Sequence, residues 1–146
     1  PAAASLLAEL RPDALGDEPG QRAAVVRAMW ERPEMVAGTG FFTTRFLSSG
    51  SGRWIGKEGA EGVYAVGLSA TAAGGRSAGI ALKIEDGSSR ARPTVTLALM
   101  RALGWLPRHA RRLLADFESP KVENTTGAVV GSIESEVPII RGDAAG

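Results

Sequence analysis

The sequence has no cysteine and a single histidine, His109. Without thiols the chain can form no disulfide, no cysteine nucleophile and no thiolate metal site. One imidazole leaves carboxylates as the main donors for any metal, which is a poor ligand set for zinc. We therefore expect a protein that uses neither a metal ion nor a cofactor.

Long hydrophobic runs and a strong net charge are also missing. No stretch reaches the roughly 20 apolar residues of a membrane helix, and the first ten residues lack the basic start and apolar centre of a signal peptide. The net charge is +1. The densest basic run, residues 108–112, shares its segment with the apolar Leu113 and Leu114, which favours a solvated helix face over a nucleic-acid patch. The prediction is a cytoplasmic protein with neither a membrane nor a nucleic acid as partner.

The apolar pattern predicts a single α+β domain over residues 1–146. A chain of this length buries roughly 68–70% of its unfolded surface in one core. Helical spacing or propensity predicts helices at residues 2–10, 21–32, 41–47, 95–106 and 108–117. Runs rich in Val, Ile, Tyr and Trp predict strands at residues 53–59, 62–68 and 78–84, and a last strand follows a turn at residues 124–127. Because short connections join the first three strands, we expect an antiparallel sheet with helices packed on it.

Two of the predicted helices carry apolar residues at helical spacing. In the helix at residues 21–32 the stripe consists of Ala24, Val25, Ala28 and Met29. The wider stripe, which is expected to cover the sheet, consists of Val95, Ala98, Leu99, Ala102, Leu103 and Leu106. The connection at residues 69–77 is predicted to be a flexible tip.

A local serine–lysine pair is absent from the sequence. Lysine serves as the base for a serine nucleophile when its surroundings lower its pKa, and the local form of that pair is Ser-x-x-Lys on one helical turn. The residues three before Lys57, Lys83 and Lys121 are Trp54, Ile80 and Glu118. His109 lies among arginines on a predicted helix, and we interpret it as a surface residue.

Lys57 is the strongest candidate for chemistry. It lies in the most glycine-rich of the predicted strands, and glycine within a strand marks the close approach of a ligand or another backbone. The run Lys57-Glu58-Gly59-Ala60 has the K-x-G form of the strand lysine in β-lactamases and penicillin-binding proteins. In that arrangement the strand edge supplies a backbone N–H to an oxyanion hole, and Ala60 would be the donor. The alternative is a solvent-facing lysine beside a hairpin glycine.

Four segments carry a resemblance to a known family. They are MVAGTG at residues 35–40, KEGAEGVY at residues 57–64, GIALKIEDG at residues 79–87 followed by Arg90, and NTTG at residues 124–127 followed by Val130 and Gly131. In this order they resemble the carboxy-terminal half of the bacterial L-asparaginase II family, over residues 21–138. The resemblance implies a serine–lysine amidohydrolase related to serine glutaminases and β-lactamases. Serine attacks the side-chain amide of asparagine, ammonia leaves, and water releases aspartate from the acyl-enzyme.

The resemblance also implies roles for individual residues. Lys57 would be the catalytic strand lysine that faces the nucleophile, tunes proton transfer and holds negative charge. Gly59 and Ala60 would form the oxyanion and substrate-binding edge, and Thr43 would line the pocket. Asp86 and Arg90 match the family pattern, although a turn-and-cap role for them is equally open.

The chain departs from the family pattern at three places. Phe41 stands where a basic or polar residue is expected, and Glu58 stands where an apolar one is usual. The family's nucleophile and its Ser-x-x-Lys motif belong to the amino-terminal half. The resemblance therefore implies that residues 1–146 form an incomplete, β-lactamase/glutaminase-like partial domain, inactive without a missing amino-terminal half as its partner. Apolar surface left uncovered would favour self-association, including homo-oligomers.

Two other functions remain open at this point. One is a penicillin-recognising serine hydrolase remnant with the same fold. The other is a non-catalytic α+β module whose glycine-rich hairpins bind a protein partner.

Overall fold

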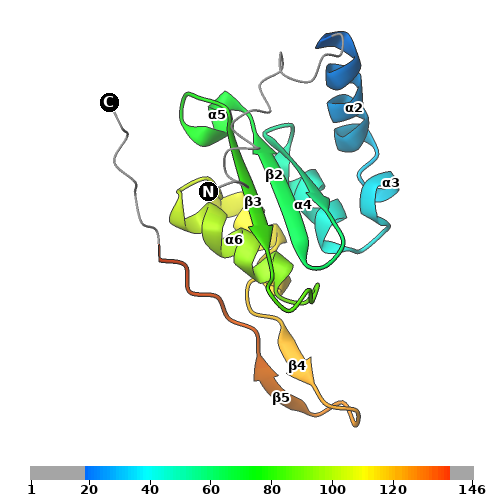
Figure 1. Cartoon of the computed structure of the whole chain (residues 1–146), viewed down its shortest axis with the longest axis vertical. Helices are drawn as coiled ribbons and strands as arrows, with labels where there is room; N and C mark the ends of the chain where they lie inside the picture. The colour runs from blue at the N-terminus through cyan, green and yellow to red at the C-terminus, as the bar shows by residue number, and fades with distance from the viewer. Residues whose placement is uncertain (1–18, 139–146) are drawn as a thin grey trace.

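The computed structural model describes residues 19–138, so the helix predicted at residues 2–10 lies outside the described residues. The elements are α2 (Pro19–Glu31), α3 (Glu34–Ala37), α4 (Phe42–Gly50), β1 (Trp54–Glu58), β2 (Val63–Leu68), α5 (Ala70–Ala73), β3 (Ala78–Lys83), α6 (Arg92–Ala102), α7 (Arg108–Leu113), the 3₁₀ turn η1 (Ala115–Phe117), β4 (Lys121–Glu123) and β5 (Val129–Ser132) (Figure 1). Helices pack on a small antiparallel sheet, which confirms the α+β fold class. None of the described helices has the length and apolar character needed to cross a membrane.

The three-stranded sheet is a meander in the order β1-β2-β3, as the short connections predict. Each strand agrees with its predicted range to within one or two residues. Ile80 is buried and Leu82 is half-buried, whereas Ala81 and Lys83 are exposed, so β3 alternates as a strand with one buried face does. The register places Glu58 opposite Tyr64 and Lys57 opposite Ala65.

The last two strands form a separate hairpin. Figure 1 shows β4 and β5 extending away from the three-stranded sheet. The turn between them follows the prediction at residues 124–127, because the Asn124 side-chain oxygen accepts hydrogen bonds from the backbone N–H groups of Thr126 at 3.0 Å and Ala128 at 2.9 Å. Every residue of β5 is exposed, so this hairpin adds little to the core.

The core lies between one face of the sheet and helices α4, α6 and α7. Its centre is an aromatic cluster in which the ring of Phe46 lies 5.4 Å from Phe42, 5.6 Å from Trp54 and 6.1 Å from Tyr64. Trp54, Tyr64 and Phe46 are all almost fully buried. Contacts of this kind add to the stabilisation that apolar burial already gives. The cluster fixes α4 against β1 and β2, next to the hairpin that joins these strands.

The expected stripe on the helix after β3 is wrong in part. Helix α6 ends at Ala102, and both Ala102 and Leu103 are exposed. Of the predicted stripe, Ala98 is buried and Val95 and Leu99 are half-buried. The other buried residues of α6 are Thr94, Thr96, Leu97 and Met100. Because α6 contacts β2 and β3 as well as η1, its middle is enclosed from more than one side and its last turn is not.

The helix at residues 21–32 forms as predicted, but its apolar stripe does not face the core. Ala24, Val25 and Ala28 are exposed, and Val25 keeps 61% of its surface accessible. Helix α2 is held instead by its end, where the Trp30 indole N–H donates to the Trp54 carbonyl oxygen at 2.9 Å. The tip predicted as flexible contains the short helix α5, with Ser69 as its N-cap.

Candidate functional site

A cleft of about 710 Å³ opens at the end of the β1–β2 hairpin. Its walls come from the α3–α4 connection, the hairpin, the loop before α6, the start of α6, and the segment after η1. The lining residues are Ala37, Gly40, Phe41, Phe42, Glu58, Gly59, Ala60, Tyr64, Ser89, Arg90, Arg92, Pro93, Phe117 and Pro120. A cleft of this size can hold a small polar molecule.

The hairpin tip has a tightly specified backbone. Glu61 and Gly62 both have positive φ, 54° and 75°, and the Val63 N–H donates to the Ala60 carbonyl oxygen at 3.2 Å. Positive φ at both central residues is typical of a type I′ turn. A Cβ on Gly62 would lie 2.8 Å from the Cβ of Ile84, and the Ile84 N–H donates to the Gly62 carbonyl oxygen at 3.0 Å. The tip is therefore fastened to the chain that follows β3.

Ala60 lines the cleft, and the hairpin does not use its backbone N–H. The Gly59 N–H is used in the hairpin, where it donates to the Val63 carbonyl oxygen at 3.0 Å. Within residues 19–138 the Ala60 N–H has no hydrogen-bond acceptor. A backbone N–H of this kind can donate to an anionic or carbonyl oxygen in the cleft.

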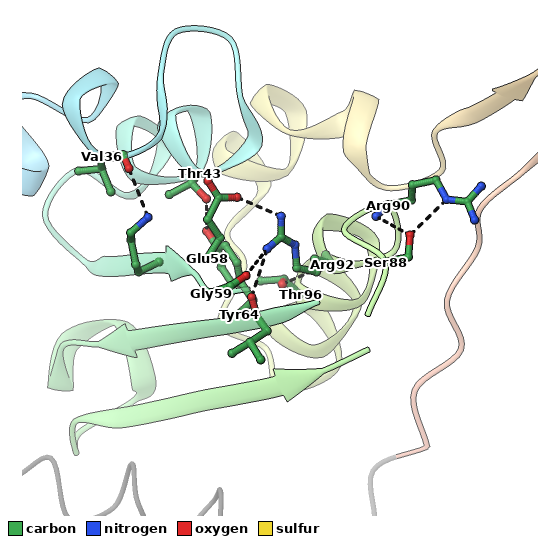
Figure 2. Close-up of polar contacts among 11 residues, drawn as sticks. Val36, Thr43, Glu58, Gly59, Tyr64, Ser88, Arg90, Arg92 and Thr96 are labelled. Carbon is green, nitrogen blue, oxygen red and sulfur yellow. Dashed lines mark hydrogen bonds and ion pairs between the residues drawn. The ribbon is translucent and has the colours of Figure 1, made fainter. Parts of the chain in front are cut away.

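The peptide between Gly59 and Ala60 is also held from its other side. The Arg92 Nη1 donates to the Gly59 carbonyl oxygen at 2.9 Å, and the Arg92 Nη2 lies 3.2 Å from the Glu58 carboxylate. Figure 2 shows this guanidinium reaching from α6 to both residues. Glu58 is therefore paired. Arg92 itself is a site residue that the sequence reasoning missed.

Tyr64 forms the inner wall of the cleft, backed by Thr43. The two hydroxyl oxygens lie 3.0 Å apart, and Thr43 is fully buried. The structure thus places Thr43 one layer behind the lining residues, where it contacts the cleft only through Tyr64. Burial raises the pKa of the Tyr64 phenol. Gly56 makes room for this phenol, since a Cβ there would lie 2.7 Å from the Tyr64 hydroxyl oxygen.

Lys57 lies beside the cleft rather than among its lining residues. Its side chain is exposed, and its Nζ donates to the Val36 carbonyl oxygen in α3 at 3.4 Å. The next residue, Ala37, lines the cleft. The structure therefore brings Gly59 and Ala60 into the cleft wall, puts the Lys57 amine next to α3, and puts Thr43 behind the wall.

A family model described as L-asparaginase II matches residues 2–135. The chain belongs to the L-asparaginase II family. All the cleft-lining residues lie within the matched range. A search of curated proteins finds no match. Membership supports an L-asparaginase-like function, since the family takes its name from that activity.

Asp86 and Arg90, which the resemblance singled out, take part in the turn before α6. The Asp86 side chain accepts from the Ser88 N–H at 2.8 Å, and the Ser88 hydroxyl accepts from the Arg90 backbone N–H at 3.3 Å and its Nε at 3.2 Å. Arg90 lines the cleft, but in Figure 2 its guanidinium points away from Arg92.

The structure brings no serine–lysine pair together in the described part of the chain. Ser89 lines the cleft, but no lysine or histidine of residues 19–138 contacts its hydroxyl. The run GRSAG at residues 75–79 matches the G-x-S-x-G pattern of a nucleophile elbow, which the sequence reasoning overlooked. It leads into strand β3 from a helix, whereas an elbow joins a strand to a helix. We therefore assign Ser77 no nucleophilic role.

Proposed function

We propose that this chain supplies the lysine and oxyanion-hole side of an L-asparaginase active site that hydrolyses asparagine through a serine acyl-enzyme. The observation that carries the proposal is the Ala60 N–H, which has no acceptor within residues 19–138 and belongs to a cleft-lining residue. It occurs in the run Lys57-Glu58-Gly59-Ala60, so the donor and the strand lysine come from one hairpin.

In the proposed reaction a serine hydroxyl attacks the side-chain carbonyl carbon of asparagine. The carbonyl oxygen becomes an oxyanion, and the Ala60 N–H donates to it. One such donor contributes about 2.7–4 kcal/mol to transition-state stabilisation. Collapse of the intermediate breaks the C–N bond, and the nitrogen takes the proton that the serine hydroxyl gave up and leaves as ammonia. Water then attacks the ester in the same way and releases aspartate.

Lys57 acts in this proposal through its ammonium group. Its Nζ contacts a backbone carbonyl beside the cleft, so it needs to move by a rotamer change to meet a bound ligand. Exposed lysine side chains make such changes on the picosecond to nanosecond timescale. The positive charge then stabilises negative charge on the substrate or on the nucleophile as it loses its proton.

We propose that the nucleophile comes from a polypeptide segment other than these 146 residues, the amino-terminal portion of a complete active site. Two observations support this. The polar contacts of Lys57 within the described range include no serine. Two large apolar side chains stand exposed near the cleft, Met35 with 79% and Phe41 with 63% of its surface accessible, and a second segment would cover them.

The experiment is complementation. The chain is co-expressed with the amino-terminal segment of another L-asparaginase II family member that bears Ser-x-x-Lys, and ammonia release from asparagine is measured on the purified pair. We expect release with the wild-type chain and none with Lys57→Ala. Lys83→Ala is the matched control, since Lys83 is an exposed lysine on β3 whose Nζ donates to the adjacent Ile84 carbonyl oxygen.

An assembled, soluble pair that releases no ammonia would contradict the proposal. Covalent labelling of that pair by a penicillin, without competition from asparagine, would instead favour the penicillin-recognising hydrolase.

A further inference from the structure

We propose that Arg92 is a positioning residue that aligns the Gly59–Ala60 peptide, so that the Ala60 N–H points into the cleft as an oxyanion donor. The inference rests on the proposed function and goes beyond it, because neither the K-x-G-A run nor the family resemblance assigns Arg92 a role. It concerns a side chain on α6 that acts on a hairpin 33 residues away in sequence.

The geometry of the peptide couples the Gly59 carbonyl to the Ala60 N–H. The carbonyl of Gly59 and the N–H of Ala60 belong to one planar unit, and in a trans peptide they point in opposite directions. Arg92 Nη1 holds the carbonyl oxygen at 2.9 Å and also lies 3.4 Å from the Val63 carbonyl oxygen, on the other arm of the hairpin. Rotation of the peptide plane would break the bond to Gly59. Arg92 therefore fixes the direction of the Ala60 N–H through the Gly59 carbonyl.

The arginine is itself held in place from several sides. Its side chain is 14% exposed, and Glu58 pairs with its second terminal nitrogen at 3.2 Å. Its backbone starts α6, and the fully buried Thr96 donates its hydroxyl to the Arg92 carbonyl oxygen at 2.7 Å. Helix α6 packs on β2 and β3. Because these contacts already hold the guanidinium in one position, it loses little conformational entropy during the reaction. Preorganisation of an oxyanion hole requires this.

The charge of Arg92 also strengthens the donor. A hydrogen bond from a cation to a carbonyl polarises the peptide, and linked hydrogen bonds strengthen one another in surroundings of low dielectric constant. The Ala60 N–H is therefore a better donor with Arg92 present than with a neutral side chain of the same length.

The test uses two measurements. The first is the amide NMR spectrum of the full 146-residue chain, where Arg92→Met is expected to shift the Ala60 signal while Arg101→Met, a matched change at an exposed arginine on the same helix, leaves it in place. The second is the kinetics of the complemented enzyme. There we expect Arg92→Met to lower kcat by roughly 10- to 100-fold and to change KM by less than about threefold.

Further variants separate positioning from general support of the fold. Arg92→Lys keeps one charged donor and should recover part of kcat. Glu58→Gln removes the ion pair but leaves the bond from Arg92 to Gly59, so the Ala60 amide signal should move less than it does in Arg92→Met. If Arg92→Met does not fold, Arg92→Lys carries the test by the same two measurements.

Two results would overturn the inference: an Ala60 signal unchanged in a folded Arg92 variant, or a loss of activity that appears in KM alone. A wild-type pair that releases no ammonia would instead overturn the proposed function, and the Ala60 signal would still decide whether Arg92 orients the peptide.

Discussion

The stability of the protein at alkaline pH tests the burial of Tyr64 in the core beside the cleft. Tyr64 is the only tyrosine in the chain, and its side chain is 1% exposed. Burial raises the pKa of its phenol above the ordinary 10.0, because a phenolate there would lose its hydration. The hydrogen bond with Thr43 and the charge of Arg92 act in the opposite direction, and the charge of Glu58 adds to the rise.

The sign of the effect follows from proton binding. Above about pH 10 the tyrosine of the unfolded chain has lost its proton, while Tyr64 in the folded chain keeps it. The unfolded state then binds fewer protons, so the free energy of unfolding falls as the pH rises. The slope approaches about 1.4 kcal/mol per pH unit, begins near pH 10 and continues until the buried phenol itself ionises. Below that range Tyr64 contributes no pH dependence.

The assay combines urea unfolding at a series of pH values with the absorbance of tyrosinate. Tyr64→Phe is the reference, because both proteins share every other titrating group, and the difference between their slopes isolates the phenol. We expect tyrosinate to appear only together with the loss of circular dichroism. The reasoning would be refuted if tyrosinate formed with a midpoint near pH 10 while the chain stayed folded, or if Tyr64→Phe kept the full slope.

Two further predictions concern the hairpin tip. Gly62→Ala should lower the free energy of unfolding by roughly 2–4 kcal/mol in urea titrations, because it adds left-handed strain to a clash with Ile84. Gly127→Ala is its control, since Gly127 has φ of +80° but open space around it. This control should lower the free energy of unfolding by about 1–2 kcal/mol, because it adds only the left-handed strain. Equal losses in the two variants would show that the clash at Gly62 is relieved. Glu61→Asn should raise the free energy of unfolding by up to about 1 kcal/mol, because asparagine tolerates positive φ better than glutamate. A lower free energy of unfolding for Glu61→Asn in the same titration would contradict that account.

The strands could be predicted because their signals are local. Alternation at Ile80 and Leu82 and the glycines at the hairpin ends depend only on neighbouring residues. Burial of helices depends on what lies against them. The apolar residues of α2 and the last turn of α6 have the spacing of a buried face, yet Val25 and Leu103 are exposed. A hydrophobic stripe in a sequence shows that a face can be buried, and only the arrangement of the other elements determines whether it is.

The residues of the candidate site also fall into two groups, those with a local sequence signal and those that depend on distant contacts. Gly59 and Ala60 could be singled out from one tetrapeptide, because the turn around them is built by adjacent residues, and both line the cleft. The contacts around that turn join distant parts of the chain. Thr43 and Tyr64 are 21 residues apart, and Arg92 and Glu58 are 34 residues apart. No short motif encodes such pairs, so Arg92 was missed and Thr43 was expected on the wall of the cleft rather than behind it.

An ion pair accommodates the Glu58 carboxylate beside the hairpin. A carboxylate that is only 31% exposed would be costly without a partner, and Arg92 supplies one. The same guanidinium binds the Gly59 carbonyl through its other terminal nitrogen, and that bond involves no atom of the Glu58 side chain. The peptide that carries the Ala60 N–H is thus held by the arginine whatever the middle residue of K-x-G is. An apolar residue at position 58 would remove the ion pair but not the Arg92–Gly59 hydrogen bond, so substitution of Arg92 should disturb this peptide more than substitution of Glu58.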